Sequence, residues 1–424
     1  MTLSEFWANQ NSSQSQIFQN CLENYKTTTV ESFGTMEDDN APPQNANEKC
    51  VGPKAATAGK APSCEGCPNQ SACASGASAK ALDRDAENVR KALSGVSNVI
   101  LVLSGKGGVG KSTVACQLAH TLASDHDGMD EAYSVGVLDV DICGPSAPRM
   151  LLGGNGRHRV HHSGSGWTPV YAHENLAVMS ISFLLPDQDA AVCWRGPRKN
   201  GLIKQFLCET DWGSEGLDYL IIDTPPGTSD EHISTVQFLM SSISEPVSEG
   251  EHNGPRVQAV VVTTGEEASL ADVRKEMNFC KKTSLPVIGV IENMTTFQTP
   301  LKNLKFQKTQ DMHGNQCEVD CTAEIIELIQ SRCPELLDVT VNSNLFPPPS
   351  IGGGAKAMTQ KFKVPYLGCL PMDPNLLKAC DEGLCFVESF DYSPAIRPLQ
   401  SIVESIIKSA PCSTETRPNS MITD

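Results

Sequence analysis

One stretch of the chain reads Asn98-Val-Ile-Leu-Val-Leu-Ser-Gly-Lys-Gly-Gly-Val-Gly-Lys-Ser-Thr113. Residues 99–103 form an apolar, β-branched run that has the length of a buried strand. Residues 105–112 match the pattern G-x-x-x-x-G-K-[ST], in which a glycine-rich loop surrounds phosphate groups. Residues 111–123 then predict a helix, and the N-terminal end of a helix favours anions. Strand, loop and helix together predict a nucleotide site.

The loop itself supplies most of the nucleotide-binding residues that we predict. Its glycines let successive backbone N–H groups turn toward phosphate oxygens. Lys111 is expected to reach the β- and γ-phosphates of ATP, and the hydroxyl of Ser112 to bind Mg²⁺. The second lysine, Lys106, either acts across a dimer interface on the partner's nucleotide or is a solvated charge. The predicted nucleotide-binding residues of the loop are Gly105, Lys106, Gly107, Gly108, Val109, Gly110, Lys111, Ser112 and Thr113.

Two further predicted strands end in acidic residues. Residues 133–146 read as a strand that runs into a loop with Asp139 and Asp141, and residues 217–223 as a strand that ends at Asp223. Ligands collect at the carboxyl ends of parallel strands. We therefore expect Asp223 to support Mg²⁺, and Asp139 or Asp141 to hold a Mg²⁺-bound water or to orient the attacking water. A simple strand-end turn is the alternative for these two acids.

Two other positions are predicted to face the nucleotide. Gly227 lies in the turn after Asp223, and its backbone N–H is expected to sense the γ-phosphate, as in a switch loop. Asn293 ends a predicted strand, residues 286–294, and is expected to hydrogen-bond a purine edge. We expect catalysis to depend on Lys106, Lys111, Asp139, Asp141 and Asp223.

Four cysteines precede the loop in the spacing C-x13-C-x2-C-x5-C: Cys50, Cys64, Cys67 and Cys73. The residues around them are mostly Gly, Pro, Ala and Ser, which cannot build a core, so packing does not explain these thiols. Metal ligation does, because four thiolates can close around Zn²⁺ or a [4Fe–4S] cluster. The uneven spacing and the Pro beside Cys67 favour the cluster, and zinc is the alternative.

Composition limits the class of protein. The 424 residues carry a net charge of −17, which argues against nucleic acid as a partner. No apolar run approaches the ~20 residues of a membrane helix, and we expect no targeting segment. Seventeen cysteines suggest a reducing compartment, so we expect a cytoplasmic protein.

The order of segments predicts an α/β fold. Continuous apolar strands alternate with helical segments, which is typical of a mostly parallel sheet buried on both faces. We predict a three-layer P-loop NTPase fold with an N-terminal, Cys-rich, cluster-binding extension. The predicted parts are a disordered polar tail (1–49), the Cys-rich extension with a linker helix (50–94), the P-loop ATPase domain (95–395) and a C-terminal helix and tail (396–424).

These motifs together resemble a known family. The loop resembles the deviant Walker A loop of the MinD/Mrp group of dimeric P-loop ATPases. The four cysteines are similar to the N-terminal pattern of one branch, the Nbp-type nucleotide-binding scaffolds of cytosolic iron–sulfur protein assembly. The resemblance covers about residues 50–395 and extends to residues 139–146, 223–230 and 291–294.

The resemblance implies a scaffold that assembles a [4Fe–4S] cluster and passes it to cytosolic and nuclear apo-proteins under the control of slow ATP hydrolysis. It implies that the N-terminal cysteines hold a stable cluster and that Lys106 reaches a partner subunit. The implied partners are a second copy or a paralogous P-loop scaffold ATPase, apo iron–sulfur proteins and late-acting assembly factors, with neither nucleic acid nor membrane.

One feature departs from this family. Its members carry a C-x-x-C pair shortly after the Glu-Asn-Met segment, where two subunits share a labile cluster, but residues 295–300 here are Thr-Thr-Phe-Gln-Thr-Pro. Either Cys317 and Cys321 substitute, in a C-x3-C spacing, or the bridging cluster is missing.

Two other functions stay open from the sequence. A MinD-like positioning ATPase would share the loop, but it would want a basic amphipathic terminal helix, and the predicted helix at residues 399–408 is not basic. A zinc-stabilised nucleotide-binding regulatory protein would differ from the scaffold in the metal that it holds.

Overall fold

The computed structural model describes residues 57–67, 70–74, 77–124, 132–154, 158–164, 166–185, 194, 196–213, 216–243, 254–312, 315–347 and 353–412. Contacts within the chain divide it into two units, Met1–Leu82 and Asp83–Asp424. Cys50 and the predicted polar tail lie outside the described residues.

The first unit contains the short 3₁₀ helix η2 and helix α3, and helix α4 begins in it. Pro62 opens η2 at its first position, where a missing N–H costs nothing because the first amides of a helix are unpaired anyway. The bounds are η2 (Pro62–Cys64), α3 (Gln70–Ala74) and α4 (Ala77–Ala92).

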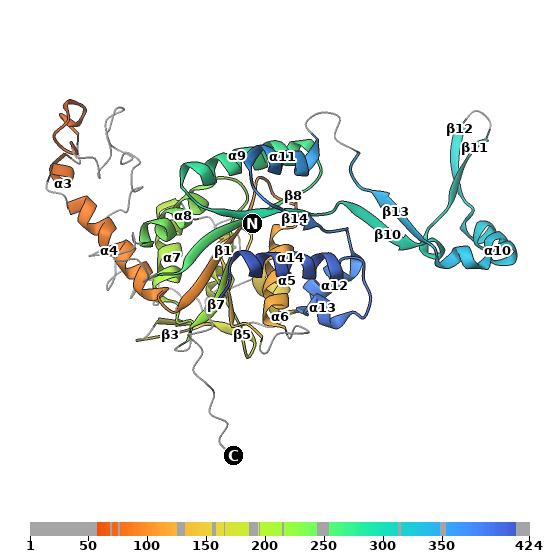
Figure 1. Ribbon diagram of the computed structural model, residues 1–424, viewed down its shortest axis with the longest axis horizontal. Helices are drawn as coiled ribbons and strands as arrows, with labels where there is room; N and C mark the ends of the chain where they lie inside the picture. The colour runs from red at the N-terminus through yellow and green to blue at the C-terminus, as the bar shows by residue number, and fades with distance from the viewer. Residues whose placement is uncertain are drawn as a thin grey trace, which may run out of the picture. The chain divides into compact units, whose positions relative to one another are not determined.

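The second unit is built around a twisted sheet (Figure 1). Its inner strands, such as β1 and β7, are almost entirely buried on both faces, as their apolar runs predict, whereas the edge strands β5 and β14 are partly exposed. In chain order they are β1 (Val96–Ser104), β2 (Val135–Asp139), β5 (Val170–His173), β6 (Leu176–Ser180), β7 (Leu217–Asp223), β8 (Arg256–Thr263), β9 (Val287–Glu292) and β14 (Tyr366–Cys369). The spatial order is β14-β9-β8-β1-β7-β2-β6-β5, and every neighbouring pair is parallel except β5 and β6.

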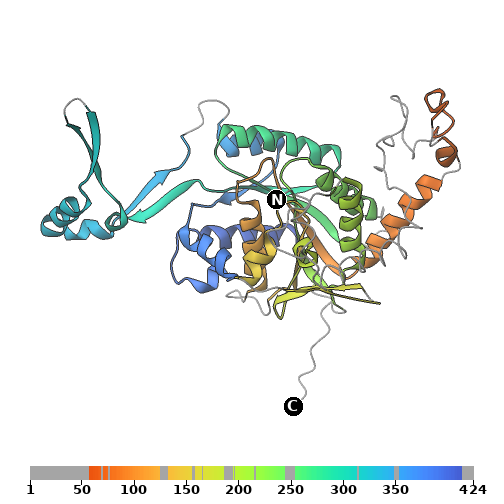
Figure 2. The ribbon, with the colours of Figure 1, turned by 180° about the vertical axis from the view of Figure 1, so that it is seen from behind.

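Helices cover both faces of this sheet, which confirms the predicted three-layer α/β architecture (Figures 1 and 2). Odd positions of β1, such as Leu101, face one helical layer, and even positions, such as Val102, face the other. The first layer contains the end of α4 with α7 (Gly196–Glu209), α8 (Asp230–Ser242), α9 (Glu267–Lys282) and α11 (Gly354–Phe362). The second contains α5 (Lys111–Ala123), α6 (Ala147–Leu152), α12 (Pro374–Glu382), α13 (Phe386–Ser389) and α14 (Ile396–Ser409).

The closing helix α14 belongs to the core of the second unit. Its apolar side chains Leu399, Ile402, Val403 and Ile406 are buried in the same cluster as those of α5. The sequence predicts docking of this helix rather than membrane binding, and these contacts confirm the docking.

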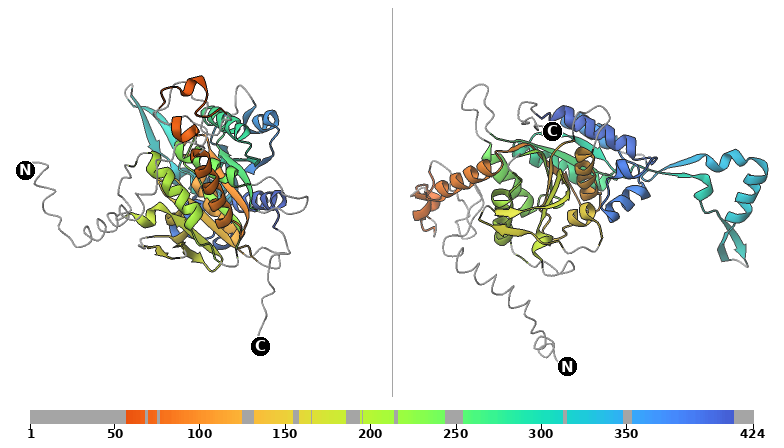
Figure 3. Two further views of the ribbon diagram at one scale, coloured as in Figure 1. Left: turned by 90° about the vertical axis from the view of Figure 1, so that its left-hand side faces the viewer. Right: turned by 90° about the horizontal axis from the view of Figure 1, so that it is seen from below.

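Segments without strong hydrophobic periodicity form small two-stranded ribbons. One ribbon leads out from the end of β9 and carries a hairpin and a helix (Figure 3). Their strands consist mostly of polar residues, so no alternation of apolar residues marks them in the sequence. The elements are β3 (His161–Ser163), β4 (Gly166–Thr168), η3 (Ile181–Leu184), β10 (Thr296–Pro300), η4 (Leu301–Asn303), β11 (Gln307–Met312), β12 (Asn315–Asp320), α10 (Thr322–Arg332), η5 (Pro334–Asp338) and β13 (Thr340–Asn344).

Candidate nucleotide site

The phosphate loop runs from the end of β1 to the start of α5. Gly108 and Gly110 have φ values of +81° and +82°, a backbone conformation that side-chain-bearing residues rarely adopt. Gly105 needs to be glycine for a different reason, because a Cβ there would lie 2.5 Å from the backbone carbon of Asp272 in α9. The glycines therefore set both the turn of the loop and its close packing against a neighbouring helix.

Lys111 and Asp223 meet at the centre of the site. Lys111 Nζ forms an ion pair with Asp223 Oδ1 and lies 3.3 Å from the hydroxyl of Ser112. Both charged side chains are buried, and the Asp223 side chain is fully inaccessible. The sequence places these two residues 112 positions apart, and adjacent strands β1 and β7 bring them together.

The same geometry fits a magnesium ion. Within the described part of the chain, Asp223 Oδ2 is buried and has no hydrogen-bond partner. A buried carboxylate oxygen without a partner raises the free energy of the folded chain. Carboxylate and hydroxyl oxygens are the ligands that a hard cation such as Mg²⁺ prefers. Asp223 and Ser112 would hold Mg²⁺ here, and the ion would neutralise phosphate charge.

Asp139 lies opposite Asp223 in the register of β2 and β7. Its carboxylate is buried and accepts hydrogen bonds from the amides of Asp141 (3.1 Å) and Ala147 (3.2 Å). Burial, and then the charge of Asp223, raises the pKa of Asp139. Asp139 thus organises the loop after β2.

Asp141 is placed differently, because β2 has already ended and its side chain is only half-buried. It accepts a hydrogen bond from the amide of Gly144 at 3.2 Å. Burial is also the main cause that raises the pKa of Asp141. Of the two acids, Asp141 is the more accessible for orienting a water, and that role stays a prediction.

Lys106 is paired within its own chain. Its Nζ forms an ion pair with Glu266, the residue at the N-cap of α9, and both side chains are partly exposed. The sequence analysis missed Glu266, which lies 160 residues away. A partly exposed pair of this kind is weak and can open. The contact of Lys106 with a partner subunit stays a prediction.

Asn293 and Gly227 also contact the loop or its supporting strand. The side-chain amide of Asn293 donates to the carbonyl of Val109 at 3.0 Å, so this residue supports the loop, and its contact with a purine stays a prediction. The amide of Gly227 donates to the carbonyl of Ser104 at 2.7 Å. Its predicted contact with a γ-phosphate therefore requires this hydrogen bond to break.

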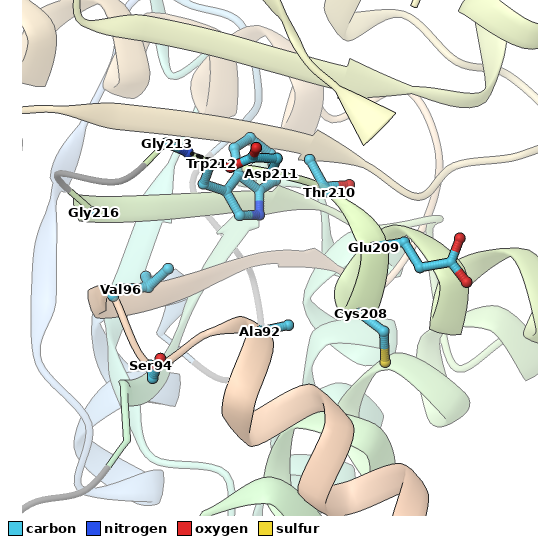
Figure 4. Close-up of a pocket in the computed structure, with 11 residues that line it drawn as sticks. Ala92, Ser94, Val96, Cys208, Glu209, Thr210, Asp211, Trp212, Gly213 and Gly216 are labelled. Atoms are coloured by element: carbon cyan, nitrogen blue, oxygen red, sulfur yellow. Dashed lines mark hydrogen bonds between the residues drawn. The ribbon is translucent and has the colours of Figure 1, made fainter. Parts of the chain in front are cut away.

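A pocket of about 460 Å³ lies at the opposite edge of the sheet, where β1 and β7 begin (Figure 4). Its lining includes Cys208, Thr210, Trp212 and Val96, and the amide of Gly213 donates to Asp211 at 3.1 Å. No residue of the phosphate loop lines it, so the pocket is separate from the nucleotide site.

Comparison with known proteins assigns the family. A model of the ParA group described as NUBPL iron-transfer P-loop NTPase matches residues 95–333, which is more than half of the chain. The chain belongs to this NUBPL-type P-loop NTPase family. The match includes the phosphate loop, Asp139, Asp223 and Asn293. As an NUBPL-type NTPase it binds nucleotide, and ATP with Mg²⁺ is the ligand that the loop and Asp223 suit.

A comparison with solved structures finds similar chains. An Archaeoglobus fulgidus nucleotide-binding protein in complex with ADP has 28% identity and a TM-score of 0.47, and the match covers 73% of this chain and 98% of that one. The cell division ATPase MinD of Pyrococcus furiosus has 19% identity and a TM-score of 0.41, with 74% and 99% covered. MinD of Pyrococcus horikoshii with Mg-ADP has 18% identity and a TM-score of 0.42, with 74% and 98% covered.

The structure of this NUBPL-type NTPase describes three of the four predicted N-terminal cysteine ligands, Cys64, Cys67 and Cys73. They lie close in sequence, around η2 and α3. The amide of Cys67 donates to the carbonyl of Cys64 at 3.1 Å, Cys64 is buried, and Cys67 and Cys73 are half-buried. Among the described residues, no group of three His, Cys, Asp or Glu side chains is arranged to hold a metal ion. The fourth ligand, Cys50, lies outside them.

The later cysteine pair lies in the hairpin strand β12 and at the start of α10. Cys317 lies in β12, opposite Gln310 of β11, and Cys321 is the N-cap residue of α10. Cys321 is buried, and its Sγ lies 3.4 Å from the carbonyl of Phe306. Cys321 therefore packs within the ribbon, and its use as a cluster ligand stays a prediction.

None of the helices in the described ranges has both the length and the apolar character needed to span a membrane.

Proposed function

We propose that this NTPase is an ATP-dependent scaffold that assembles a [4Fe–4S] cluster and transfers it to cytosolic and nuclear apo-proteins. The main support is that one chain contains both a match to the iron-transfer family and a set of four cysteines. A family match to iron-transfer P-loop NTPases covers residues 95–333, and the cysteine set Cys50, Cys64, Cys67 and Cys73 lies just before it. In this account the cluster is the cargo, and its stable holding site is the four thiolates.

The nucleotide site supplies the control. When ATP binds, Lys111 exchanges the carboxylate of Asp223 for the β- and γ-phosphates, and both oxygens of Asp223 become available to support Mg²⁺. The charge of the triphosphate replaces that of Asp223 as the partner of the buried ammonium. Asp141 then orients the attacking water. Once the nucleotide has left, Lys111 returns to Asp223, so the site has two charge arrangements that depend on the nucleotide.

The active form in this proposal is a dimer, either of two identical chains or with a paralogous P-loop scaffold ATPase. Lys106 leaves Glu266 and contacts the nucleotide of the partner subunit, which the weak, partly exposed ion pair allows. The other partners are apo iron–sulfur proteins and late-acting assembly factors. We place the protein in the cytoplasm, where thiols stay reduced and available for cluster binding.

Metal analysis tests the cargo. The full chain is purified without oxygen, and iron, acid-labile sulfide, zinc and the visible absorption spectrum are measured. We expect about four iron and four sulfide per chain, as one [4Fe–4S] cluster requires, and loss of most of both in a Cys64→Ala, Cys67→Ala variant.

A matched control removes two other cysteines, as Cys208→Ala, Cys412→Ala. Burial raises the pKa of each of these thiols to about 11, so they stay protonated and are poor ligands. This variant should keep its iron. Stoichiometric zinc with no cluster after reconstitution would refute the scaffold and support a structural zinc site. Cluster that survives in the Cys64→Ala, Cys67→Ala variant would direct attention to Cys317 and Cys321.

A further inference from the structure

The segment between Asp223 and helix α8, residues 224–229, packs directly on the phosphate loop. Gly227 lies at its centre with a φ of +71°, and a Cβ on Gly227 would lie 3.5 Å from the carbonyl oxygen of Gly105. The ring of Pro226 would lie 3.9 Å from a Cβ on Gly107. We call residues 224–229 the switch segment. A change in the phosphates bound by the loop can therefore act directly on this segment.

Both backbone polar groups of Gly227 are held by hydrogen bonds. Its amide donates to the carbonyl of Ser104 at the end of β1, at 2.7 Å. Its carbonyl lies 2.8 Å from Nδ1 of His232, in the first turn of α8. A carbonyl can only accept, so Nδ1 must carry the proton. A phosphate oxygen accepts hydrogen bonds, so it can replace Ser104 as the partner of the Gly227 amide. It cannot replace His232 as the donor to the Gly227 carbonyl.

His232 packs against α9, although its Nδ1 proton is donated to Gly227 and, among the described residues, Oε1 of Glu276 has no hydrogen-bond partner. Its side chain is almost fully buried, and Nδ1 lies 3.4 Å from Oε1 of Glu276, which is equally buried. The imidazole also packs against Phe279, with ring centroids 4.9 Å apart. Burial lowers the pKa of His232 to about 4, so the ring is neutral near pH 7 and acts as a fixed hydrogen-bond donor.

Helix α9 contacts the nucleotide site at three places. Its N-cap residue Glu266 pairs with Lys106, its residues Asp272 and Val273 touch Gly105, and Glu276 reaches His232. A movement of the switch segment that is passed through His232 therefore arrives at the helix that restrains Lys106. One buried side chain thus connects the predicted γ-phosphate sensor to the lysine predicted to act on the partner.

We propose that His232 is the positioning residue of the switch segment. It holds the carbonyl of Gly227 while the amide of Gly227 exchanges the carbonyl of Ser104 for the γ-phosphate, and it passes this change to α9. This inference rests on the proposed nucleotide-controlled cycle, and it adds a residue and a route that the motif residues do not include. His232 contacts neither substrate nor reacting atoms and acts through Gly227.

The test compares three substitutions at one position. His232→Asn places an amide N–H close to the position of Nδ1, His232→Gln places it near Nε2 instead, and His232→Phe keeps the ring without a donor. Affinities for ADP and for a non-hydrolysable ATP analogue are measured with each variant. We expect the preference for the ATP analogue over ADP to fall about tenfold with Phe and with Gln, as for one lost hydrogen bond. Asn should retain it within about threefold.

The matched control is His120→Phe in α5. His120 is also buried, and burial likewise lowers its pKa to about 4, but α5 covers the other face of the sheet. This variant should discriminate between the nucleotides as the wild type does. Unfolding temperatures of all variants identify any that fail to fold. The Asn and Gln variants can be compared directly, because both carry an amide and they differ by one methylene group.

Hydrogen exchange supplies a second measurement that a merely structural role would not affect. In the wild type, the ATP analogue should change amide protection both in residues 224–229 and at the start of α9. In the His232→Gln variant only the change in the phosphate loop should remain. Equal discrimination in the Asn, Gln and Phe variants would overturn the inference alone. A wild type that binds neither nucleotide would overturn the proposed function with it.

Discussion

At the scale of single residues, the two lysines of the phosphate loop differ in burial although they lie five positions apart in the sequence. Lys111 is buried and faces the fully buried Asp223, whereas Lys106 and Glu266 are partly exposed. Charges in a dry interior interact strongly and are costly to leave unpaired, but exposed pairs contribute little. The same residue type therefore serves as a fixed part of the site at one position and as a movable group at the other.

Replacing each lysine by methionine should separate these roles. Lys111→Met leaves Asp223 and Asp139 together without a cation, so we expect the free energy of unfolding to fall by about 3 kcal/mol. Affinity for ATP should fall roughly a hundredfold or more. Lys106→Met should change the free energy of unfolding by less than about 1 kcal/mol. Urea titrations and equilibrium nucleotide binding measure both, and equal losses of stability in the two variants would contradict the assignment.

Glu276 predicts a pH dependence. Burial raises its pKa to about 7 from the ordinary 4.5, so between these values the folded chain keeps a proton that the unfolded chain has released. Stability from this group is therefore full below pH 4.5 and is lost as the pH rises through 7. Glu276→Gln cannot release a proton, so its free energy of unfolding should not fall in this way. Relative to the wild type, the free energy of unfolding of the variant should rise by up to about 3 kcal/mol as the pH increases from 4.5 to 7. Urea unfolding at several pH values measures the gap, and a gap that does not change with pH would refute the prediction.

At the scale of elements, the loop and helix α9 are fitted to each other through glycine. Gly105 is limited by contact, since a Cβ would lie 2.5 Å from the backbone of Asp272. Gly108 is limited by conformation, with a φ of +81° and open space where a Cβ would point. The first glycine sets where a helix can lie, and the second affects only the loop.

Alanine at each position should show this difference. Gly105→Ala forces α9 away from the loop, so we expect a loss of about 3 kcal/mol in the free energy of unfolding and altered exchange at the start of α9. Gly108→Ala adds only backbone strain, about 1 kcal/mol, and should leave exchange in α9 unchanged. Thermal unfolding and hydrogen exchange test both. Unchanged α9 exchange in the Gly105→Ala variant would show that the close contact is not a constraint.

At the scale of the whole molecule, the features predicted from the sequence are those encoded locally. The phosphate loop, the buried strands and the acids at their ends each lie within a short run of residues, so the three-layer fold could be predicted, and Lys111 and Asp223 were assigned to one site. The direct ion pair between these two residues was not predicted. Ser229 before Asp230 is a further local helix-start signal, which the sequence analysis did not use, and its hydroxyl accepts a hydrogen bond from the amide of His232 at 3.3 Å.

The features that the sequence does not reveal depend on contacts between distant segments. Glu266 meets Lys106 and Glu276 meets His232 only because α9 packs beside the loop and α8. The ribbons β10–β13 and β11–β12 consist mostly of polar residues, so no hydrophobic period marks them. Long-range partners and two-sided polar strands leave no local pattern to detect.

The central claim is that nucleotide state controls the release of a cluster, and cluster transfer measures it most directly. Chain loaded with cluster under anaerobic conditions is mixed with an apo acceptor protein, with Mg-ATP, with Mg-ADP or without nucleotide, and holo acceptor is followed over time. The account predicts a transfer rate that depends on Mg-ATP, and a Lys111→Met variant that keeps its iron but has lost this dependence. Transfer at one rate under all three conditions would contradict the account.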